Sequence, residues 1–468
     1  MVRLMNKYKR LMGNSVIFAI GNLGSKLMQF IMIPLYSYTL TTSEYGKVDF
    51  LTTVISLILP ILSVDIFDAV FRYALDKTDN NKVTFNTSIL FSLAITVISF
   101  IIAILLQLSI HTYPIMYAEY VLVASLFFSL ISNYARAVNK IKEFAIAGII
   151  NSIAMGLLNF ALLYFLNWKM DGYLLSMGSG MLFAVIYIMF ACHFWNELDF
   201  RSYSWQKLKV MLKYSTPLVP NLLAWWLNSA SDRMFILLFI GASANGIYAM
   251  ASKIPNILST LMTIFLQSWQ ISVVEEYDSE HGKRFITNVF QVFTTAVFVI
   301  AIGILTFLKP IFHLLVSPAY FIGWQVAPFL LLSIIYSNAA SFLGTIYTAT
   351  KKTVPIMYTT VIGAIVNIVL SIVIIPFIGI YGAAIANIFS FALVSFFRFK
   401  DIIKANKISI KLGQFILLHI LFIIVLLANF LSKNNILPIS SGLISLLIIA
   451  VIDPNFKRVI SIIKSKIS

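Results

Sequence analysis

The sequence predicts an all-α integral membrane protein with about fourteen transmembrane helices. Hydrophobic residues make up 60% of the 468-residue chain and charged residues only 11%, whereas about a quarter of residues are charged in soluble proteins. Uncharged runs such as 173–195 and 412–432 are long enough to cross about 30 Å of hydrocarbon at about 1.5 Å per residue. The strand-length alternation that a membrane β-barrel needs is absent from the sequence.

Apolar segments of this kind follow one another along the whole chain. We predict spans at residues 13–38, 47–73, 84–110, 117–136, 144–167, 173–196, 214–240, 245–271, 286–308, 323–348, 355–377, 381–398, 412–432 and 436–453. The basic start of the chain resembles a signal peptide. The apolar run behind it is too long for one and lacks a small-residue cleavage site, so we expect a retained first span.

The distribution of Lys and Arg predicts the orientation of these spans. With the N-terminus in the cytoplasm, 27 of the 34 Lys and Arg residues fall on the cytoplasmic side and four on the outer side. Such an excess is the positive-inside pattern of plasma-membrane proteins. Both termini are therefore expected in the cytoplasm.

Composition and motifs argue against several classes of protein. Cys192 is the only cysteine, which excludes an intrachain disulfide and a cysteine metal cluster. A net charge of +16 would suggest nucleic acid in a soluble chain, but here the topology accounts for it. Phosphate-binding loops, zinc motifs and clustered outer carboxylates are missing, so we predict no enzyme activity, no metal, no cofactor and no nucleic-acid partner.

Two short motifs recur after about 200 residues and predict an internal repeat. Tyr45-Gly46 has a counterpart in Asn245-Gly246, and Gly172 has one in Gly382. Parallel repeats are common in transporters, with the substrate site between the halves. We predict an N-terminal lobe at 1–200, a cytoplasmic linker at 201–213, a C-terminal lobe at 214–400, and two extra helices with a cytoplasmic tail at 401–468.

The linker is basic and carries Trp205, Lys207, Lys209 and Lys213. One interpretation is a segment that lies on the cytoplasmic leaflet, because each Lys or Arg near anionic lipid contributes about 1 kcal/mol. The other is the usual excess of Lys and Arg in cytoplasmic loops, without any specific contact to lipid.

Lys26, Arg233 and Lys253 lie inside predicted spans. A charge at membrane depth costs a few kcal/mol or more, so such residues usually face a wet cavity or a partner. Arg233 and Lys253 fall at similar depths on neighbouring spans and would suit an anionic substrate group. In the alternative interpretation, Asp232 neutralises one cation and Lys253 extends toward the outer surface.

Asp65, Asp68 and Arg72 are spaced to share one face of the second span. The first hypothesis is a structural ion pair between Asp68 and Arg72. The second is a relay that couples transport to protons or sodium ions, in which Asp232 could also take part.

Aromatic rings and side-chain amides flank the cations of the second half, and such groups commonly hold sugars. The candidate sugar contacts are Asn221, Trp225, Asn228, Gln267, Trp269 and Gln270. Tryptophan is equally expected as an anchor at the membrane interface.

These stretches together resemble the polysaccharide flippases of the MOP superfamily, whose relatives include the MATE transporters. The resemblance rests on Tyr214-Ser-Thr-Pro217, Asp232-Arg233, Gly246-Ile-Tyr248 and Gln267-Ser-Trp269-Gln270 in the second half. In the first half it rests on Pro34-Leu-Tyr, Glu44-Tyr45-Gly46 and Phe67-Asp68-Ala-Val-Phe71-Arg72.

The resemblance implies a MATE-like fold and the transport of undecaprenyl-pyrophosphate-linked oligosaccharide repeat units to the outer leaflet by alternating access. The diphosphate would meet a cationic cavity formed by Lys26, Arg233, Lys253 and Arg72. The two last spans would be additions that form a groove for the lipid tail, and polysaccharide polymerases or glycosyltransferases would be partners.

Two other functions fit the same sequence. A drug or cation antiporter of the superfamily would favour uncompensated carboxylates in its cavity, whereas this one is net cationic. A membrane scaffold for a polysaccharide assembly complex would carry the fold without transport.

Overall fold

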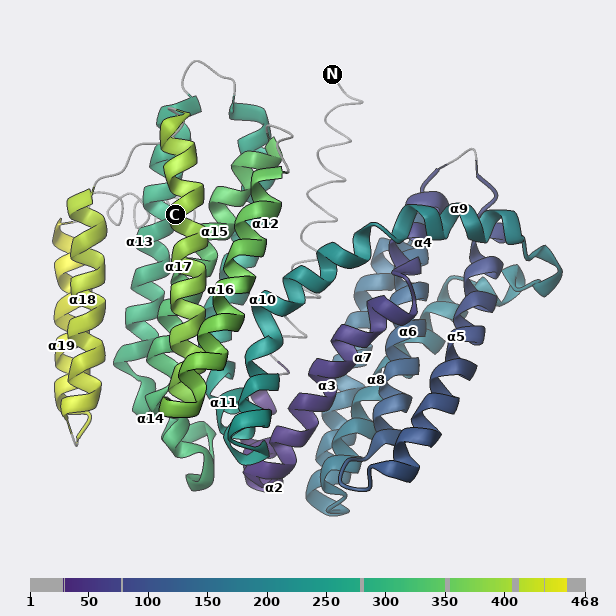
Figure 1. Cartoon of the computed structure of the whole chain (residues 1–468), viewed down its shortest axis with the longest axis horizontal. Helices are drawn as coiled ribbons and strands as arrows, with labels where there is room; N and C mark the ends of the chain where they lie inside the picture. The colour runs from purple at the N-terminus through teal and green to yellow at the C-terminus, as the bar shows by residue number, and fades with distance from the viewer. Residues whose placement is uncertain are drawn as a thin grey trace, which may run out of the picture. The chain divides into compact units, whose positions relative to one another are not determined.

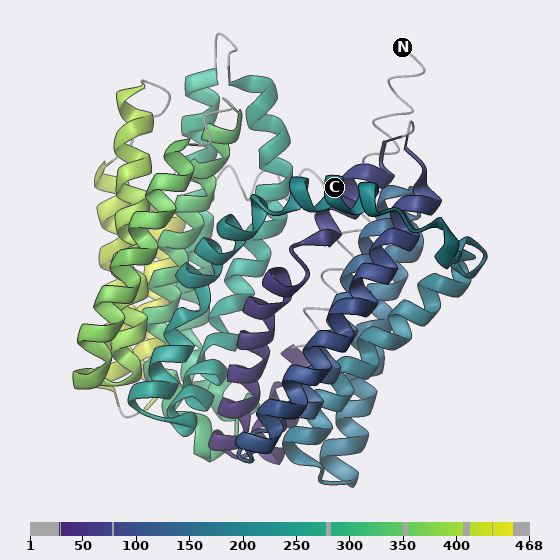
Figure 2. The same ribbon diagram turned by 45° about the vertical axis from the view of Figure 1, so that its right-hand side comes forward.

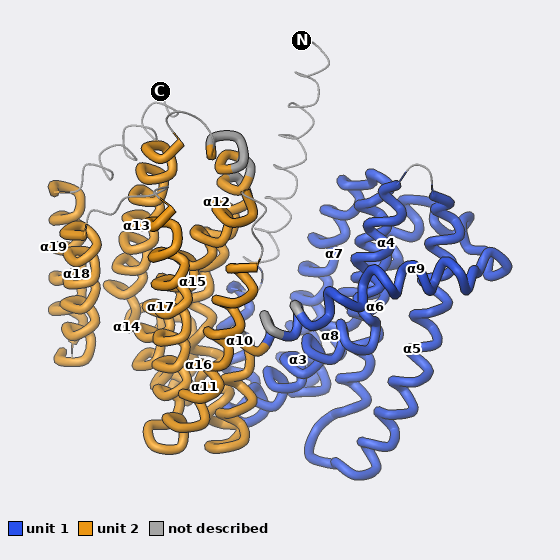
Figure 3. Tube along the Cα trace, turned by 45° about the horizontal axis from the view of Figure 1, so that its top comes forward, with its two compact units in different colours: residues 1–226 blue, residues 227–468 orange. Residues whose placement is uncertain are grey.

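The computed structural model describes residues 28, 30–76, 79–277, 282–349, 354–405, 412–432 and 434–452, and every regular element among them is helical. The chain forms two compact units, residues 1–226 and 227–468 (Figure 3). The boundary lies inside one helix, α10. This arrangement agrees with the predicted all-α fold.

Unit 1 contains α2 to α9 and the first part of α10 (Figure 1). Its elements are α2 (Ile33–Thr39), α3 (Thr42–Leu62), α4 (Ile66–Ala74), α5 (Asn81–Ser109), α6 (Ile115–Ala137), α7 (Ile141–Asn159), η1 (Phe160–Phe165), α8 (Lys169–Ala191), η2 (Phe194–Glu197), η3 (Phe200–Ser202), α9 (Trp205–Ser215) and α10 (Leu218–Phe239).

Unit 2 contains the rest of α10 and the helices that follow it. They are α11 (Ala242–Lys253), α12 (Pro255–Glu276), α13 (Gly282–Thr306), α14 (Leu308–Leu315), η4 (Pro318–Gln325), α15 (Ala327–Ala349), α16 (Val354–Ile378), α17 (Ile380–Lys404), α18 (Leu412–Leu431) and α19 (Ile436–Ile452).

Among the described residues, ten helices are long and apolar enough to cross a membrane. An eleventh span results when α11 and α12, which are bent by 46° at their junction, are counted together. Most of the predicted first span, 13–38, lies outside the described residues. The chain is therefore a multi-pass membrane protein.

The repeated motifs occupy equivalent places in the two units. Gly46 is the fifth residue of α3, and Gly246 is the fifth residue of α11. Gly172 and Gly382 likewise lie in the first turn of α8 and α17. The sequence repeat thus marks the starts of corresponding helices.

One end of unit 1 is closed by a buried aromatic cluster. The rings of Phe85 and Tyr134 stack with centroids 4.4 Å apart, and Phe194 lies edge-on to Tyr134 at 4.9 Å. Tyr134 donates its hydroxyl hydrogen to Glu197. Asn86 donates to the Glu197 carbonyl at 2.8 Å, so the segment that leads to α9 is fixed against α5 and α6.

The other end of unit 1 holds a second group of buried rings. Tyr36 and Tyr173 meet edge to face at 4.9 Å, and Tyr45 stacks on Tyr36 at 6.2 Å. Asn159 donates to the Tyr36 hydroxyl at 3.2 Å. The Tyr36 hydroxyl therefore has a side-chain partner although it is buried.

Arg398 of α17 is the most deeply buried cation that the described residues contain, at 3% exposure. Its Nε donates to Thr359 Oγ1 at 2.9 Å, its Nη1 to the Ala340 carbonyl at 2.8 Å, and its Nη2 to Thr360 Oγ1 at 2.9 Å. A Cβ on Gly344 would lie 2.9 Å from Nη1. The glycine therefore makes room for a guanidinium that joins α15, α16 and α17 through neutral acceptors.

The two last helices pack tightly on α13. A Cβ on Gly442 would lie 1.9 Å from Thr306 Oγ1, and Asn429 donates to the Leu305 carbonyl at 3.1 Å. Lys309 donates to the Ser432 carbonyl at the end of α18 at 2.8 Å, and burial lowers the pKa of this lysine. Within unit 2, the two predicted extra helices, α18 and α19, therefore pack closely on α13 and α14.

Candidate functional site

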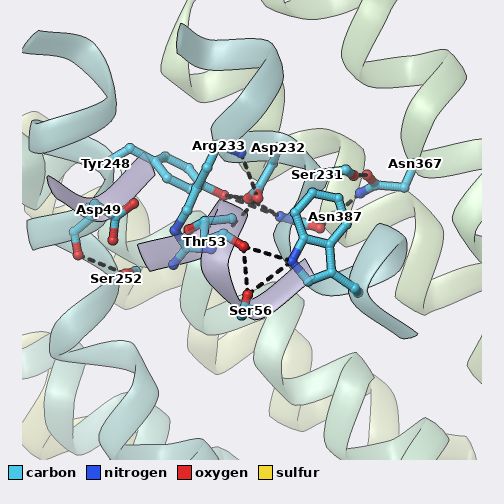
Figure 4. Close-up of polar contacts among 12 residues, drawn as sticks. Asp49, Thr53, Ser56, Ser231, Asp232, Arg233, Tyr248, Ser252, Asn367 and Asn387 are labelled. Carbon is cyan, nitrogen blue, oxygen red and sulfur yellow. Dashed lines mark hydrogen bonds and ion pairs between the residues drawn. The ribbon is translucent and has the colours of Figure 1, made fainter. Parts of the chain in front are cut away.

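A buried hydrogen-bond network in unit 2 is centred on Asp232 of α10 (Figure 4). The Asp232 carboxylate accepts a hydrogen bond from the Tyr248 hydroxyl of α11 and one from Asn387 Nδ2 of α17 at 3.0 Å. It also accepts one from the backbone N–H of Arg233 at 2.9 Å. Asp232 is 4% exposed, so these donors replace the water that a carboxylate would otherwise need.

The network continues from Asn387 to α16 and back to α10. Asn367 Nδ2 donates to Asn387 Oδ1 at 2.8 Å, and Ser231 Oγ donates to Asn367 Oδ1 at 3.3 Å. Asn387 Nδ2 also lies 3.2 Å from the Tyr248 hydroxyl. Four helices are therefore connected by one chain of buried polar groups, in which each bond strengthens its neighbours.

Arg233 forms an ion pair with Asp232, because its Nη1 lies 3.8 Å from Asp232 Oδ1. This distance exceeds that of a hydrogen bond, while the donors closest to the carboxylate are neutral or belong to the backbone. The Arg233 side chain is 19% exposed, against 5% for Asp232. The pairing with Asp232 that the sequence allowed is present, and the guanidinium stays partly accessible.

Lys253 ends α11 and lies directly before the 46° bend into α12. The span predicted at 245–271 is bent at this point, because Pro255 lacks the N–H that would continue the helix straight through it. Lys253 is half-buried. A cation suits this position, since the C-terminal end of a helix carries partial negative charge.

The predicted sugar contacts differ in accessibility. Gln267 and Gln270 of α12 are exposed. Trp269 is 3% exposed and stacks on Phe342 of α15 with ring centroids 4.7 Å apart. The side chains of Asn221, Trp225 and Asn228 lie outside the described part of the structure, as does the whole of Lys26.

In unit 1, the second predicted span ends earlier than expected. The interpretation of 47–73 as one helix was wrong, because α3 ends at Leu62 and α4 begins at Ile66. Val64 and Asp65 take left-handed backbone conformations with φ of 49° and 50°. The Ser63 hydroxyl accepts the Asp65 N–H at 3.2 Å, which offers the backbone an alternative to the helical bond.

The break separates the three charged residues that were expected on one helical face. Asp65 is 7% exposed, whereas Asp68 and Arg72 on α4 are exposed. In the described part of the chain no ion pair joins Asp68 to Arg72. The two carboxylates therefore have different surroundings, although they are three residues apart.

Glu119 of α6 is a buried carboxyl that the sequence analysis did not single out. It is 7% exposed and accepts a hydrogen bond from Ser99 Oγ of α5 at 2.6 Å. Arg398 of α17 is a second buried charge that was not singled out. Sequence pattern could not reveal their partners, because a neighbouring helix supplies the serine or threonine that bonds each of them.

Among the described residues, no group of three or more His, Cys, Asp or Glu side chains could hold a metal ion. The polar cluster at Asp232 instead offers one carboxylate with amide and hydroxyl oxygens. Such a set can bind a proton, or a cation that accepts neutral oxygen ligands.

Solved structures with similar architecture are transporters. A lipid II flippase MurJ in the inward closed conformation is 13% identical, with a TM-score of 0.71 over 94% of this chain and 98% of that chain. An inward-facing multidrug resistance MATE family transporter of the MOP superfamily is 13% identical, with a TM-score of 0.66 over 83% of this chain and 96% of that chain. An outward-facing one is 14% identical, with a TM-score of 0.55 over 83% and 94%.

These likenesses define the class as a multi-pass membrane protein with the fold of the MOP superfamily. The chain belongs to the polysaccharide biosynthesis protein family, whose sequence model matches residues 11–270. No curated protein matches it in sequence. The resemblance predicted from the sequence is thereby confirmed at the level of family and fold.

Proposed function

We propose that the chain translocates oligosaccharide repeat units linked to undecaprenyl pyrophosphate from the cytoplasmic to the outer leaflet of the plasma membrane. The observation that carries this proposal is the family match over residues 11–270 in a chain with the fold of a lipid flippase. Alternating access between its two halves would move the polar head group.

The intramembrane cations supply the recognition that such a substrate needs. A diphosphate is a compact dianion, and guanidinium and ammonium groups bind it through charge-assisted hydrogen bonds. The Asp232 carboxylate accepts a hydrogen bond from the neutral Tyr248 hydroxyl, and the Arg233 guanidinium lies 3.8 Å from it and is partly accessible. This arrangement supports a role for Arg233 as an anion ligand. Lys253, Lys26 and Arg72 complete the proposed set.

Sugar contacts belong to the same proposal. Gln267 and Gln270 are exposed on α12 and can bond hydroxyl groups, together with Asn221, Trp225 and Asn228. Trp269 is packed against Phe342, so its contribution would be to hold α12 in place.

Transport against a gradient needs an energy source, and we propose coupling to a proton or sodium gradient through Asp232. The carboxylate lies in a network of four helices, so a change in its charge would alter the contacts of all four. Asp65 is a second candidate, because it is buried at a break in the helix. Polymerases and glycosyltransferases are the proposed partners.

A cellular experiment tests the function. In cells lacking the gene, wild-type protein should restore surface polysaccharide, whereas Arg233→Gln and Lys253→Gln should restore little. The control is Lys47→Gln, a half-buried lysine that donates to the Thr112 carbonyl in unit 1. Full restoration by both charge variants would refute the cationic site. Efflux of organic cations by the wild type would favour an antiporter, and restoration without any lipid translocation would favour a scaffold.

A further inference from the structure

The surface of unit 1 around α9 combines exposed aromatic rings with exposed cations. We define the α9 face as the residues Phe200, Arg201, Trp205, Lys209, Lys213 and Tyr214. Phe200 and Trp205 are 57% and 56% exposed. Large rings beside basic side chains are typical of a helix that lies in the interfacial region of a bilayer.

The opposite side of α9 packs on the hydrophobic core of unit 1. This packing determines which side of the helix is exposed. Leu208 and Met211 are 3% and 0% exposed and belong to the apolar cluster of α4, α5 and α6. Lys207 turns inward, where it pairs with Asp79 and lies 4.2 Å from the centre of the Tyr73 ring. The α9 face is therefore presented outward by packing as well as by sequence pattern.

The position of α9 matches the level of lipid head groups. It runs across one end of the unit 1 helices and contacts α4 and α5 (Figures 1 and 2). At this same end the membrane-spanning helix α5 begins at Asn81 and α6 ends at Ala137. A helix that crosses the ends of spanning helices lies where the hydrocarbon gives way to head groups.

The cations of this face have no acidic partner among the described residues. Ion pairs form nearby between Lys82 and Asp199 at 2.9 Å and between Lys207 and Asp79, so these carboxylates already have partners. Arg201, Lys209 and Lys213 stay exposed, and Lys209 lies 5.5 Å from the Trp205 ring centre. The face thus lacks negative charge of its own.

We propose that the α9 face binds the head groups of anionic phospholipids. Phosphate and the net negative charge of such lipids complement Arg201, Lys209 and Lys213, while the rings of Phe200, Trp205 and Tyr214 enter the boundary between head groups and acyl chains. This site is separate from the proposed transport function and does not depend on it.

Fluorescence quenching by brominated lipids tests the site. The purified full-length protein is placed in phosphatidylcholine vesicles that contain brominated phosphatidylglycerol or, at equal bromine content, brominated phosphatidylcholine. The signal of Trp205 is the difference between wild type and Trp205→Phe. We expect stronger quenching by the anionic lipid, with the preference weakened by high salt because exposed charges are screened.

Matched triple variants separate a local site from overall charge. Arg201→Gln/Lys209→Gln/Lys213→Gln should lose the preference, so that both lipids quench Trp205 equally. Lys142→Gln/Lys400→Gln/Lys404→Gln removes the same charge from other exposed positions and should keep it. Thermal unfolding of both variants checks that they fold.

The opposite results would overturn the proposal. Equal quenching by the two lipids in the wild type, or no quenching of Trp205 by either, would show that the face does not bind anionic lipid. Loss of the preference in the control variant would assign it to net charge instead of to this site.

Discussion

Tyr248 donates its phenolic hydrogen to the carboxylate of Asp232 within unit 2, and Asn387 bonds to both residues. All three are buried, at 1%, 4% and 8% exposure. The middle of α11 is thus tied to α10 and α17 through a carboxylate. Replacing one partner at a time therefore measures its contribution to stability or to transport.

Replacing Tyr248 by Phe removes one donor and leaves the ring in place. We expect a loss of about 1–3 kcal/mol in stability, because a buried carboxylate loses one of its three hydrogen-bond donors. Thermal unfolding in detergent measures it. Tyr164→Phe is the control, since that side chain is 63% exposed, and its stability should stay within about 0.5 kcal/mol of wild type. Equal behaviour of the two variants would show that the Tyr248 bond contributes nothing.

Replacing Asp232 by Asn should uncouple transport from its driving ion. The amide has nearly the shape of the carboxyl group, but it neither titrates nor carries charge. Transport by wild-type vesicles should depend on a proton or a sodium gradient, and the variant should lose that dependence. Glu197→Gln is the control, because it alters a carboxylate that bonds to Tyr134 in unit 1. Unchanged ion dependence in the Asp232 variant would remove this residue from coupling.

The sequence singled out Asp232 and Arg233 and allowed their pairing, but it did not indicate the neutral partners of Asp232. Asp232 and Arg233 stood out because charge is rare in apolar segments. Tyr248, Asn367 and Asn387 are far from them in the chain, and only the packing of α10, α11, α16 and α17 brings these side chains together. Spacing within one helix cannot reveal such contacts.

The pair between Lys82 and Asp199 predicts a dependence of stability on pH. The Lys82 ammonium donates to the Asp199 carboxylate and holds the pKa of that carboxyl below its usual value of 3.8. A lowered folded-state pKa contributes stability that is present above the unfolded pKa and is lost as pH falls through the folded pKa.

Lys82→Gln should therefore be less stable than wild type at pH about 7, and the difference should shrink below pH about 4. Thermal unfolding at several pH values measures it, with Lys142→Gln as the control. A difference that stayed constant across this range would exclude the ionised pair as its source.

Gly442 tests the packing of the last two helices. Its absent side chain lets α19 approach Thr306, so Gly442→Val should destabilise the protein by about 1–3 kcal/mol through overpacking. Gly303 lies on α13, one turn before Thr306, and has no atom within 4 Å of an added Cβ. Gly303→Ala should be neutral or slightly stabilising. Thermal unfolding of both compares the sites, and an unaffected Gly442→Val protein would contradict the close packing.

Helix boundaries were the least predictable part of the fold. Hydrophobicity extends through Ser63 and Ile254, so the spans at 47–73 and 245–271 were predicted without the positions of their breaks. The breaks depend on local bonds, namely the Ser63 hydroxyl to the Asp65 N–H and the missing N–H of Pro255. The Ser63 bond was visible only once the backbone was known, whereas Pro255 can be read from the sequence and is typical of a bent helix. The apolar segments themselves, and their order, were predictable because membrane helices need about twenty apolar residues.

The most direct measurement is translocation in vesicles that contain only this protein and a fluorescent oligosaccharide linked to undecaprenyl pyrophosphate. A membrane-impermeant quencher reports how much substrate reaches the opposite leaflet. We predict fast translocation by the wild type, a rate near that of empty vesicles for Arg233→Gln/Lys253→Gln, and a wild-type rate for Lys47→Gln. Translocation by the double variant at the wild-type rate, or none by the folded wild-type protein under an imposed proton or sodium gradient, would contradict the account.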